Sequence, residues 1–335
     1  MKVLIVGDMN LGTNSRSLAD GFKANGHETR CIDTSVSTAP PKGSPLWWSL
    51  RNFGHVTSSE NNRVRQELSA ATDAFHPDMM LAIKTVAYDQ GIFLEAIIPK
   101  KLHLSFDDVS NPDNTSPNYL RRENEWDLII TTKRHNIQEL CARGAQDVLF
   151  MWGAYDPQIH RNVVPLHERK YDIGFIGAAR PDRAELPRQF ARHAPTAGAI
   201  FGPRWRRHYP FGVRGVTVRG SAAGSSYAAA ANSFRIGLVL LNSDNRDQHT
   251  MRTFETPASG QAILAERTDE HMELFEENES AIFFAGLDEA WEKLRWLLSN
   301  RALLGRIASA GHRITTEGRH TYRDRAQEIL NYVSQ

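Results

Sequence analysis

The 335-residue chain contains only two cysteines, Cys31 and Cys141, and they lie far apart in the sequence. Two thiols cannot build a thiolate zinc knuckle, and a disulfide between them is not expected, which favours a reducing, cytoplasmic setting. No run of about 18 apolar residues occurs, so no segment is expected to span a bilayer. The formal net charge of +1 offers no overall field for nucleic acid. Nucleic acid is therefore an unlikely partner, while peripheral membrane contact stays open.

Motifs for metals and nucleotides are also scarce. No Asp-x-Asp triplet occurs and no histidine pair has ligand spacing within one helix, so we expect neither a metal nor a resident cofactor. The loop at residues 7–15 has the glycine spacing of a P-loop, with Gly12 as its second glycine, but Thr13 replaces the lysine. The loop is not G-x-G-x-x-G either, which argues against a nicotinamide oxidoreductase. It is equally consistent with a ligand-contacting backbone and with a plain turn.

The chain otherwise has the composition of a globular protein, with 41% apolar and 24% charged residues, and its length suits two domains. Short apolar runs alternate with helical patterns twice along the chain, which predicts two α/β domains with parallel sheets. The predicted domains are residues 1–155 and 171–320, with a linker at 156–170. A C-terminal helix at 321–335 is placed where it could pack back on the first domain.

The expected elements follow from the apolar patterns. Residues 1–7 are too short for a signal-peptide core and are interpreted as the first strand. Residues 34–65, with paired prolines and paired tryptophans, are predicted to be a long excursion from the core. Strands are expected at 3–6, 28–32, 79–84, 102–106, 127–131, 148–152, 171–177, 199–202, 215–218, 236–242, 261–266 and 281–284. Helices are expected at 14–25, 87–98, 134–143, 183–192, 251–259, 287–298 and 322–333.

Charged side chains follow two of the expected strands, at the edge where ligands bind in parallel sheets. Asp107 and Asp108 come after the strand at 102–106, where one carboxylate could be a general base, its pKa raised by its neighbour. A helix cap or a solvated loop would explain the pair equally. Arg180 and Arg183 follow Gly177 at the start of a helix, where positive charge and free N–H groups suit a diphosphate. A surface arginine on an amphipathic helix is the alternative.

A third candidate segment, residues 247–260, contains a short helix between two buried-type strands. Glu255 on this helix could accept both hydroxyls of a ribose, and Arg252, one turn earlier, could reach a phosphate. Asp247 lies eight residues before Glu255. By composition alone, a solvated glutamate and arginine explain the segment better. The arginine-rich run at 201–208 contains aromatics, as nucleic-acid surfaces do, but is more simply a solvated loop.

Several stretches of the second half follow one another in a distinctive order: Tyr171–Gly177 followed by Arg183, Phe201–Trp205, Arg252–Gly260, Glu273–Phe275 and His320–Arg325. In sequence and order they resemble the glycosyltransferase domain of the CgeB-like (spore maturation protein) family, which belongs with the GT-B glycosyltransferases. The first half is similar more loosely, at Phe106-Asp107-Asp108, Asp127–Thr132 and Gly144.

This resemblance implies a GT-B fold, with two Rossmann-like domains facing across a cleft. The acceptor would bind mainly to the first domain and the nucleotide-sugar donor to the second. In related retaining enzymes an E-x7-E pair serves the donor. Glu255 matches its second member, which holds the ribose, and Asp247 stands at the first, near the transferred sugar. The resemblance places Arg183 and Arg252 on the diphosphate, and the expected donor-binding set also includes Gly12, Gly177, Arg180 and Thr253.

We therefore expect a metal-independent glycosyltransferase that moves a sugar from a nucleotide-diphosphate donor to a hydroxyl acceptor, such as a glycan or lipid-linked acceptor in polysaccharide biosynthesis. The candidate catalytic residues are Asp107, Asp108 and Asp247. The alternative is a GT-B-like protein that binds a sugar or a partner without transferring anything, because position 247 lacks the usual glutamate. The base and sugar of the donor, the acceptor and the stereochemistry are left open.

Overall fold

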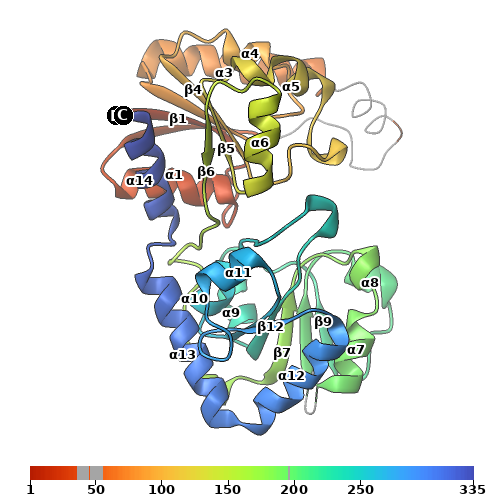
Figure 1. Cartoon of the computed structure of the whole chain (residues 1–335). Helices are drawn as coiled ribbons and strands as arrows, with labels where there is room; N and C mark the ends of the chain where they lie inside the picture. The colour runs from red at the N-terminus through yellow and green to blue at the C-terminus, as the bar shows by residue number, and fades with distance from the viewer. Residues whose placement is uncertain (36–44, 46–55, 195–196) are drawn as a thin grey trace. The chain divides into compact units, whose positions relative to one another are not determined.

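A computed structural model describes residues 1–35, 45, 56–194 and 197–335. The paired prolines and paired tryptophans of the predicted excursion lie outside the described residues. The chain divides into two compact units (Figure 1). Unit 1 comprises Met1–Trp152, Ser243–Asp247 and Tyr322–Gln335, and unit 2 comprises Gly153–Asn242 and Gln248–Thr321. Unit 1 is thus assembled from three separate stretches of the chain.

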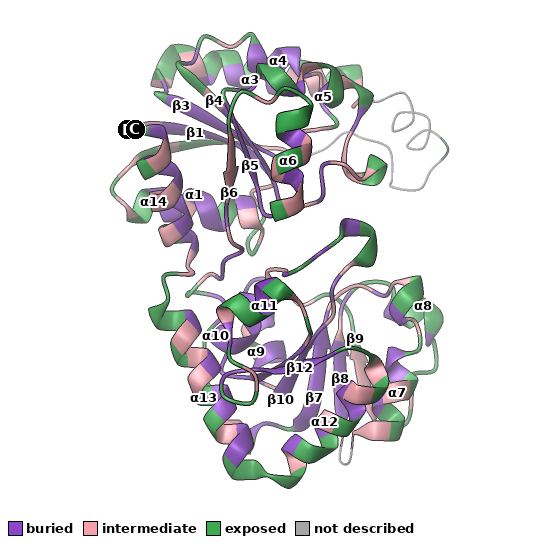
Figure 2. Cartoon of the chain, viewed as in Figure 1, coloured by how far each residue is buried: buried purple, intermediate pink, exposed green. Residues whose placement is uncertain are grey.

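The centre of unit 1 is a six-stranded sheet in the order β2-β1-β3-β4-β5-β6, with every neighbouring pair parallel. The inner strands are buried along their length, as a sheet covered on both faces requires (Figure 2). Its strands are β1 (Lys2–Gly7), β2 (Glu28–Asp33), β3 (Met79–Ile83), β4 (Lys100–Ser105), β5 (Leu128–Thr131) and β6 (Val148–Phe150).

Helices cover both faces of this sheet. The first and last helices of the chain, α1 (Asn14–Ala24) and α14 (Tyr322–Val333), pack together on one face. Their backbones approach so closely at Gly21 that a Cβ there would overlap the Tyr322 carbonyl. The opposite face is covered by α3 (Ser58–Phe75), α4 (Gly91–Leu94), α5 (Pro117–Arg122) and α6 (Arg134–Ala142).

Unit 2 is built around a second six-stranded parallel sheet, in the order β12-β11-β10-β7-β8-β9. From β7 the chain adds β8 and β9 on one side and then returns to add β10 on the other side. Its strands are β7 (Tyr171–Ile176), β8 (Gly198–Phe201), β9 (Val216–Arg219), β10 (Phe234–Val239), β11 (Ala262–Glu266) and β12 (Ile282–Phe284).

The main core of unit 2 lies between this sheet and three amphipathic helices, α7 (Leu186–His193), α12 (Leu287–Ser299) and α13 (Arg301–Glu317). Phe190, Trp291 and Leu294 are fully buried there. The other face carries α9 (Ser225–Ala231) and α10 (Arg252–Ala258). Shorter elements are η3 (Leu166–Glu168), η4 (Pro181–Arg183), α8 (Trp205–His208) and α11 (Asp269–Leu274).

All twelve expected strands are present, but several helical regions differ from the prediction. Residues 58–65, predicted as part of an excursion, form the start of α3 because the Thr57 side chain caps the helix at the Glu60 N–H and Val64 is buried. The helix expected at 87–98 shrinks to α4, since the Gln90 side chain hydrogen-bonds the carbonyls of Thr85 and Tyr88 and holds a turn there. The prediction also lacks the long helix α13 and the shorter helices α5, α8, α9 and α11.

Among the described residues, no helix combines the length and the apolar character that crossing a membrane requires. Cys31 and Cys141 are both free thiols on unit 1.

Candidate functional site

The carboxyl ends of β7 and β10 in unit 2 are the point where the strand order reverses. Loops leaving such neighbouring strands turn to opposite faces, which opens a crevice that parallel sheets use for ligands. Two arginines are anchored there. Arg252 Nε donates to the carbonyl of Ile176, the last residue of β7, at 2.9 Å. Arg183 donates to the carbonyl of Leu241, just beyond β10, also at 2.9 Å. The fold therefore brings two guanidinium groups to one end of the sheet.

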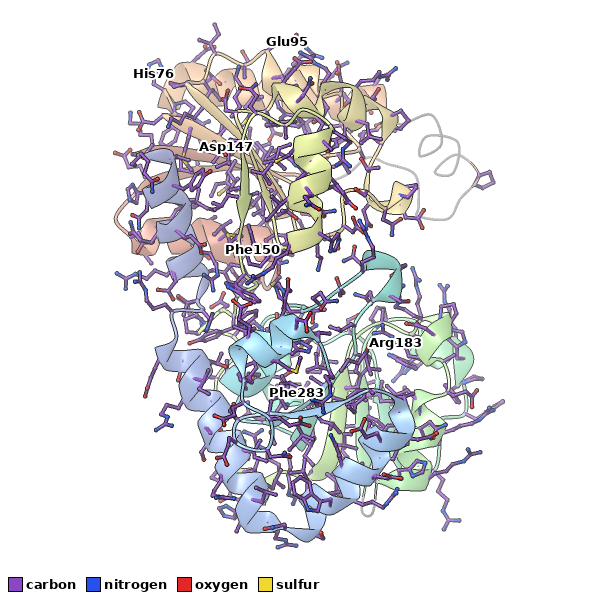
Figure 3. All side chains as sticks on the ribbon, in the orientation of Figure 1. His76, Glu95, Asp147, Phe150, Arg183 and Phe283 are labelled. Atoms are coloured by element: carbon purple, nitrogen blue, oxygen red, sulfur yellow. The ribbon has the colours of Figure 1, made fainter. Side chains whose placement is uncertain are left out.

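Arg183, which is labelled in Figure 3 and belongs to η4, is almost completely buried. Its guanidinium also donates to Asn242 Oδ1 at 3.1 Å and lies over the Phe175 ring. The Nε–H group is buried without an acceptor among the described residues. A buried donor without a partner costs free energy, which a bound anion could recover.

Glu255 lies in the first turn of α10, and its side chain is only 7% exposed. The Tyr227 hydroxyl donates to Glu255 Oε2 at 3.0 Å, and Arg252 forms an ion pair with the same oxygen. His160 Nε2 lies 3.5 Å from Oε1. The carboxylate is thus held in a fixed orientation by groups from three separate segments of unit 2.

The protonation state of His160 follows from its neighbours. The Asp156 N–H donates to His160 Nδ1 at 2.8 Å, so the ring hydrogen sits on Nε2 and faces Glu255. Burial, helped by the charge of Arg252, lowers the pKa of His160 to about 3, which keeps the ring neutral near pH 7. His160 is therefore a neutral donor facing Glu255, and Arg252 is the cation paired with this carboxylate.

The glycine-containing loop after β7 is fixed by the segment at residues 201–205. Trp205 Nε1 donates to the Gly177 carbonyl at 2.7 Å, and the Gly177 N–H donates to Phe201 at 2.9 Å. A Cβ at Gly202 would overlap the Gly177 carbonyl, so only glycine allows this approach. The aromatic and glycine residues of the run at 201–208 thus have a structural role. Arg180, further along the loop, is partly exposed and lies 3.6 Å from Asp182.

Thr253 is fully buried and faces the interior of unit 2. Its hydroxyl accepts from the Thr250 N–H at 3.1 Å and lies 2.9 Å from His271 Nε2. His271 Nδ1 in turn lies 2.7 Å from the Glu266 carbonyl, and burial lowers the pKa of His271 to about 4. These bonds fasten the start of α10 to the residues that precede and form α11.

The other predicted residues belong to unit 1. Gly12 lies in the exposed loop before α1 with a left-handed φ of 88°. Asp107 is partly exposed and forms an ion pair with Lys84 at 2.5 Å. Lys84, at φ 55°, also has the left-handed conformation that non-glycine residues rarely adopt. These residues follow β1, β3 and β4 at the carboxyl edge of the sheet.

Asp108 differs from its neighbour because its side chain is buried among donors. Arg246 donates to both carboxylate oxygens, at 2.6 and 2.9 Å, and Asn136 and the Ser110 N–H also donate to Oδ1. Burial alone would raise the pKa of Asp108, but the hydrogen bonds from Arg246 and Asn136 outweigh it and lower the pKa well below its usual range. The same Arg246 bonds Glu139, lowering the pKa of Glu139 to about 2.

Asp247 is also buried in unit 1. Its Oδ1 atom accepts from Lys133 Nζ at 2.5 Å and from Asn245 Nδ2 at 2.8 Å. The structure therefore assigns Asp247 to unit 1 and Glu255 to unit 2.

Metal ligands were not expected from the sequence. Within the described ranges, no group of three or more His, Cys, Asp or Glu side chains has an arrangement that could hold a metal ion.

Comparisons with known proteins bear on this arrangement. Residues 182–331, which include the arginines and Glu255 of the crevice, match a family model described as "Glycosyl transferase-like". No curated protein matches the chain. Among solved structures, sucrose-phosphate synthase from Thermosynechococcus elongatus has a TM-score of 0.70 at 11% identity, over 100% of this chain and 98% of that one.

HepE from Anabaena, solved in complex with UDP, has a TM-score of 0.67 at 14% identity over the full length of both chains. A glycosyltransferase from Rickettsia africae has a TM-score of 0.65 at 10% identity, over 99% of this chain and 97% of that one. The fold is GT-B. Most of the residues that match the glycosyl transferase-like family model belong to unit 2.

Four residues of the GT-B units were not identified from the sequence, namely Lys133, His160, Tyr227 and Arg246. His160 falls in the predicted linker and Tyr227 in an alanine-rich helix. Neither segment has a pattern that marks a site. Arg246 has a detectable signal only in hindsight, as a charged residue in the segment Ser243–Asp247 that the chain contributes to unit 1.

Proposed function

We propose that this GT-B protein transfers a sugar from a nucleoside-diphosphate donor to a hydroxyl acceptor. The observation that carries the proposal is the convergence of Arg183, Arg252 and Glu255 at the strand-order reversal of unit 2. The finer resemblance to the CgeB-like family agrees with the same residues. HepE, solved with UDP, supports the choice of a nucleotide donor by analogy of fold.

Each residue has a role in this proposal. Glu255 accepts hydrogen bonds from the ribose hydroxyls. These bonds are strong because the acceptor is a carboxylate that is buried and held in a fixed orientation. Arg183 and Arg252 offset the charge on the diphosphate as the bond to it breaks. Two guanidinium groups can do this without a metal, so we propose that the reaction is metal-independent. Activity in excess EDTA would support this point.

In the transfer step the acceptor oxygen forms a bond to the anomeric carbon, and the bond from that carbon to the diphosphate oxygen breaks. The electron pair leaves with the nucleoside diphosphate, and the acceptor hydroxyl loses its proton. We propose that unit 1 binds the acceptor and that Asp107, which is partly exposed, takes this proton. Asp108 is less suited because its oxygens already accept four hydrogen bonds.

The decisive experiment is calorimetric titration with a panel of nucleotides, namely UDP, GDP, TDP and CMP. At least one is expected to bind the wild type. Glu255→Gln is expected to weaken that binding by roughly 10- to 100-fold, since hydrogen bonds to charged groups contribute about 1.5–3 kcal/mol.

Glu292→Gln is the matched control, because Glu292 is an exposed glutamate of the same unit on α12. It should bind like the wild type. If no nucleotide binds the wild type, or if the Glu255 and Glu292 variants bind equally, the nucleotide assignment is wrong.

A second candidate function is a GT-B-like binding protein without transfer activity. The observation in its favour is Asp247, which is held by Lys133 and Asn245. Nucleotide binding is compatible with both candidates, so they are separated by turnover. Slow release of nucleoside diphosphate from a nucleotide sugar, without an acceptor, identifies an enzyme. Binding without any release across the panel of nucleotide sugars favours the binding protein.

A further inference from the structure

A second pocket of unit 2 lies at the opposite end of its sheet from the crevice. It has a volume of about 770 Å³, within the usual range for small-molecule sites. Asp172 and Arg235, near the starts of β7 and β10, line it together with the turn between α12 and α13 (Figure 1). Asp172 in this basal pocket and Ile176 at the crevice are four residues apart on β7, a distance of about 13 Å along a strand.

The basal pocket contains more positive than negative charge. Its cationic side chains are Lys170, Arg235, Arg295 and Arg301, and Asp172 is its single carboxylate. Arg235 pairs with Asp172 at 3.1 Å, which leaves three cations uncompensated.

None of those three finds an anion in the described parts of the chain. The Lys170 ammonium group lies over the ring of the adjacent Tyr171. The Arg301 side chain has no hydrogen bond or ion pair with any described residue. Arg295 donates to His193 Nδ1 at 3.1 Å. Burial and the charge of Arg295 lower the pKa of His193, so this partner is neutral and contributes no negative charge.

Two further features define the ligand chemistry. The 17-residue helix α13 begins at the pocket, and the partial positive charge of a helix N-terminus favours an anion. Leu166, Leu298 and Leu304 supply an apolar wall. Guanidinium groups match the geometry of phosphate oxygens, and the leucines match a hydrocarbon or ring attached to the phosphate.

We propose that the basal pocket binds the phosphate group of a ligand that also carries an apolar part. The site is separate from the nucleotide crevice and does not depend on its function. Two sources have this chemistry, a soluble phosphate monoester and the headgroup of an anionic phospholipid. In both cases Arg295 and Arg301 contact the phosphate and the leucines contact the apolar part.

The test uses the full chain and phenyl phosphate, which combines a phosphate monoester with an apolar ring. Binding by the wild type is measured by calorimetry and compared with the double variant Arg295→Ala/Arg301→Ala. Affinity should fall by about tenfold or more, because charge-assisted hydrogen bonds are lost. The control is Arg306→Ala/Arg313→Ala, which removes two exposed arginines of α13 outside the pocket. It should bind like the wild type.

Phenyl phosphate could also bind in the crevice, so Arg252→Ala is measured alongside. Affinity that survives Arg252→Ala but not the pocket double variant supports the proposal. Affinity lost only with Arg252, or lost equally in the α13 control, overturns it. The pocket variant should retain any nucleotide binding of the wild type, which separates this result from failure of the proposed transfer activity.

The lipid source is tested by sedimentation with phosphatidylcholine vesicles that contain or lack phosphatidic acid. Sedimentation that requires phosphatidic acid and is lost in the pocket variant, but not in the α13 control, supports a headgroup as the source. The proposal is overturned if the wild type binds neither phenyl phosphate at millimolar concentration nor the vesicles that contain phosphatidic acid.

Discussion

Asp107 and Asp108 are adjacent in the sequence but differ in every physical respect that matters for catalysis. Asp107 is partly exposed with one cationic partner, whereas Asp108 is buried with Arg246, Asn136 and a backbone N–H around it. A strongly lowered pKa makes Asp108 a poor proton acceptor near pH 7. At the scale of single residues, the two carboxylates should therefore respond differently to the same substitution.

Asp108→Asn is expected to lower the free energy of unfolding by about 1–3 kcal/mol, because Arg246 loses the charge of its buried partner. Asp107→Asn should leave stability nearly unchanged and lower turnover instead, since the Asp107–Lys84 pair is substantially exposed. Urea unfolding of both variants checks the first point and release of nucleoside diphosphate checks the second. Equal stability losses would contradict this division of roles.

The contacts within the site could be predicted from local sequence patterns only where the residues are close in the chain. Arg252 and Glu255 are three residues apart on one helix, so their pairing follows from helix geometry. His160 and Tyr227 reach the same carboxylate from distant segments, and no local pattern encodes such a contact. Lys133 and Asp247 are 114 residues apart, so no local pattern predicts their ion pair either. The Asp247 position was identified by spacing, while its buried ion pair was not.

At the scale of elements, α10 is placed by a glycine of the neighbouring strand. A Cβ at Gly237 on β10 would overlap the Thr256 methyl group on α10. Because α10 carries Arg252 and Glu255, the absence of a side chain at Gly237 sets the position of both charged groups.

Gly237→Ala is expected to destabilise the protein by about 1–3 kcal/mol through overpacking, and to weaken nucleotide binding. Gly305→Ala is the matched control, since a Cβ there meets nothing within 4 Å and the residue lies inside α13. That change should stabilise the protein by about 0.5–1 kcal/mol. Thermal unfolding measures the stability of the two variants. If Gly305→Ala destabilised the protein and Gly237→Ala left it unchanged, the role given to Gly237 would be refuted.

The strands were easier to predict than the helices. Each strand is a short apolar run between turn residues, and in a sheet buried on both faces that run is nearly continuous. Helix α3 was missed although Thr57-Ser58-Ser59-Glu60 has the form of a capping box. The apolar residues of its buried stripe, Val64, Leu68 and Ala71, are few and widely spaced between polar ones. Helix α4 is short because a side-chain turn at Gln90 competes with the helix, which propensity does not reveal.

At the scale of the whole molecule, buried neutral histidines link stability to pH. Burial lowers the pKa of His103 in unit 1 to about 3, of His160 in unit 2 to about 3, and of His271 to about 4. The ordinary value is 6.5, so below that pH the unfolded chain binds more protons than the folded one. Their contribution is complete above pH 6.5 and falls as the pH approaches the folded values.

Unfolding free energy is therefore expected to drop between pH 7 and pH 5, by at most about 1.4 kcal/mol per pH unit for each histidine. His103→Leu should flatten this slope for unit 1, even though it leaves the Tyr119 hydroxyl without its partner at 3.0 Å. His208→Gln, at an exposed histidine, should leave the slope as it is. Denaturant titrations across this pH range measure it, and a slope unaffected by His103→Leu would speak against the linkage.

The close packing of α1 against α14 joins the first helix of the chain to the last. During synthesis, residues 1–152 leave the ribosome first, yet the helix that covers α1 arrives only after all of unit 2 has been made. The unit that is translated first is therefore completed last. Until Tyr322–Val333 emerges, the face of α1 around Gly21 lacks the helix that packs on it. A chain stopped within α13 should consequently be a substrate for chaperones, because unit 1 is still incomplete.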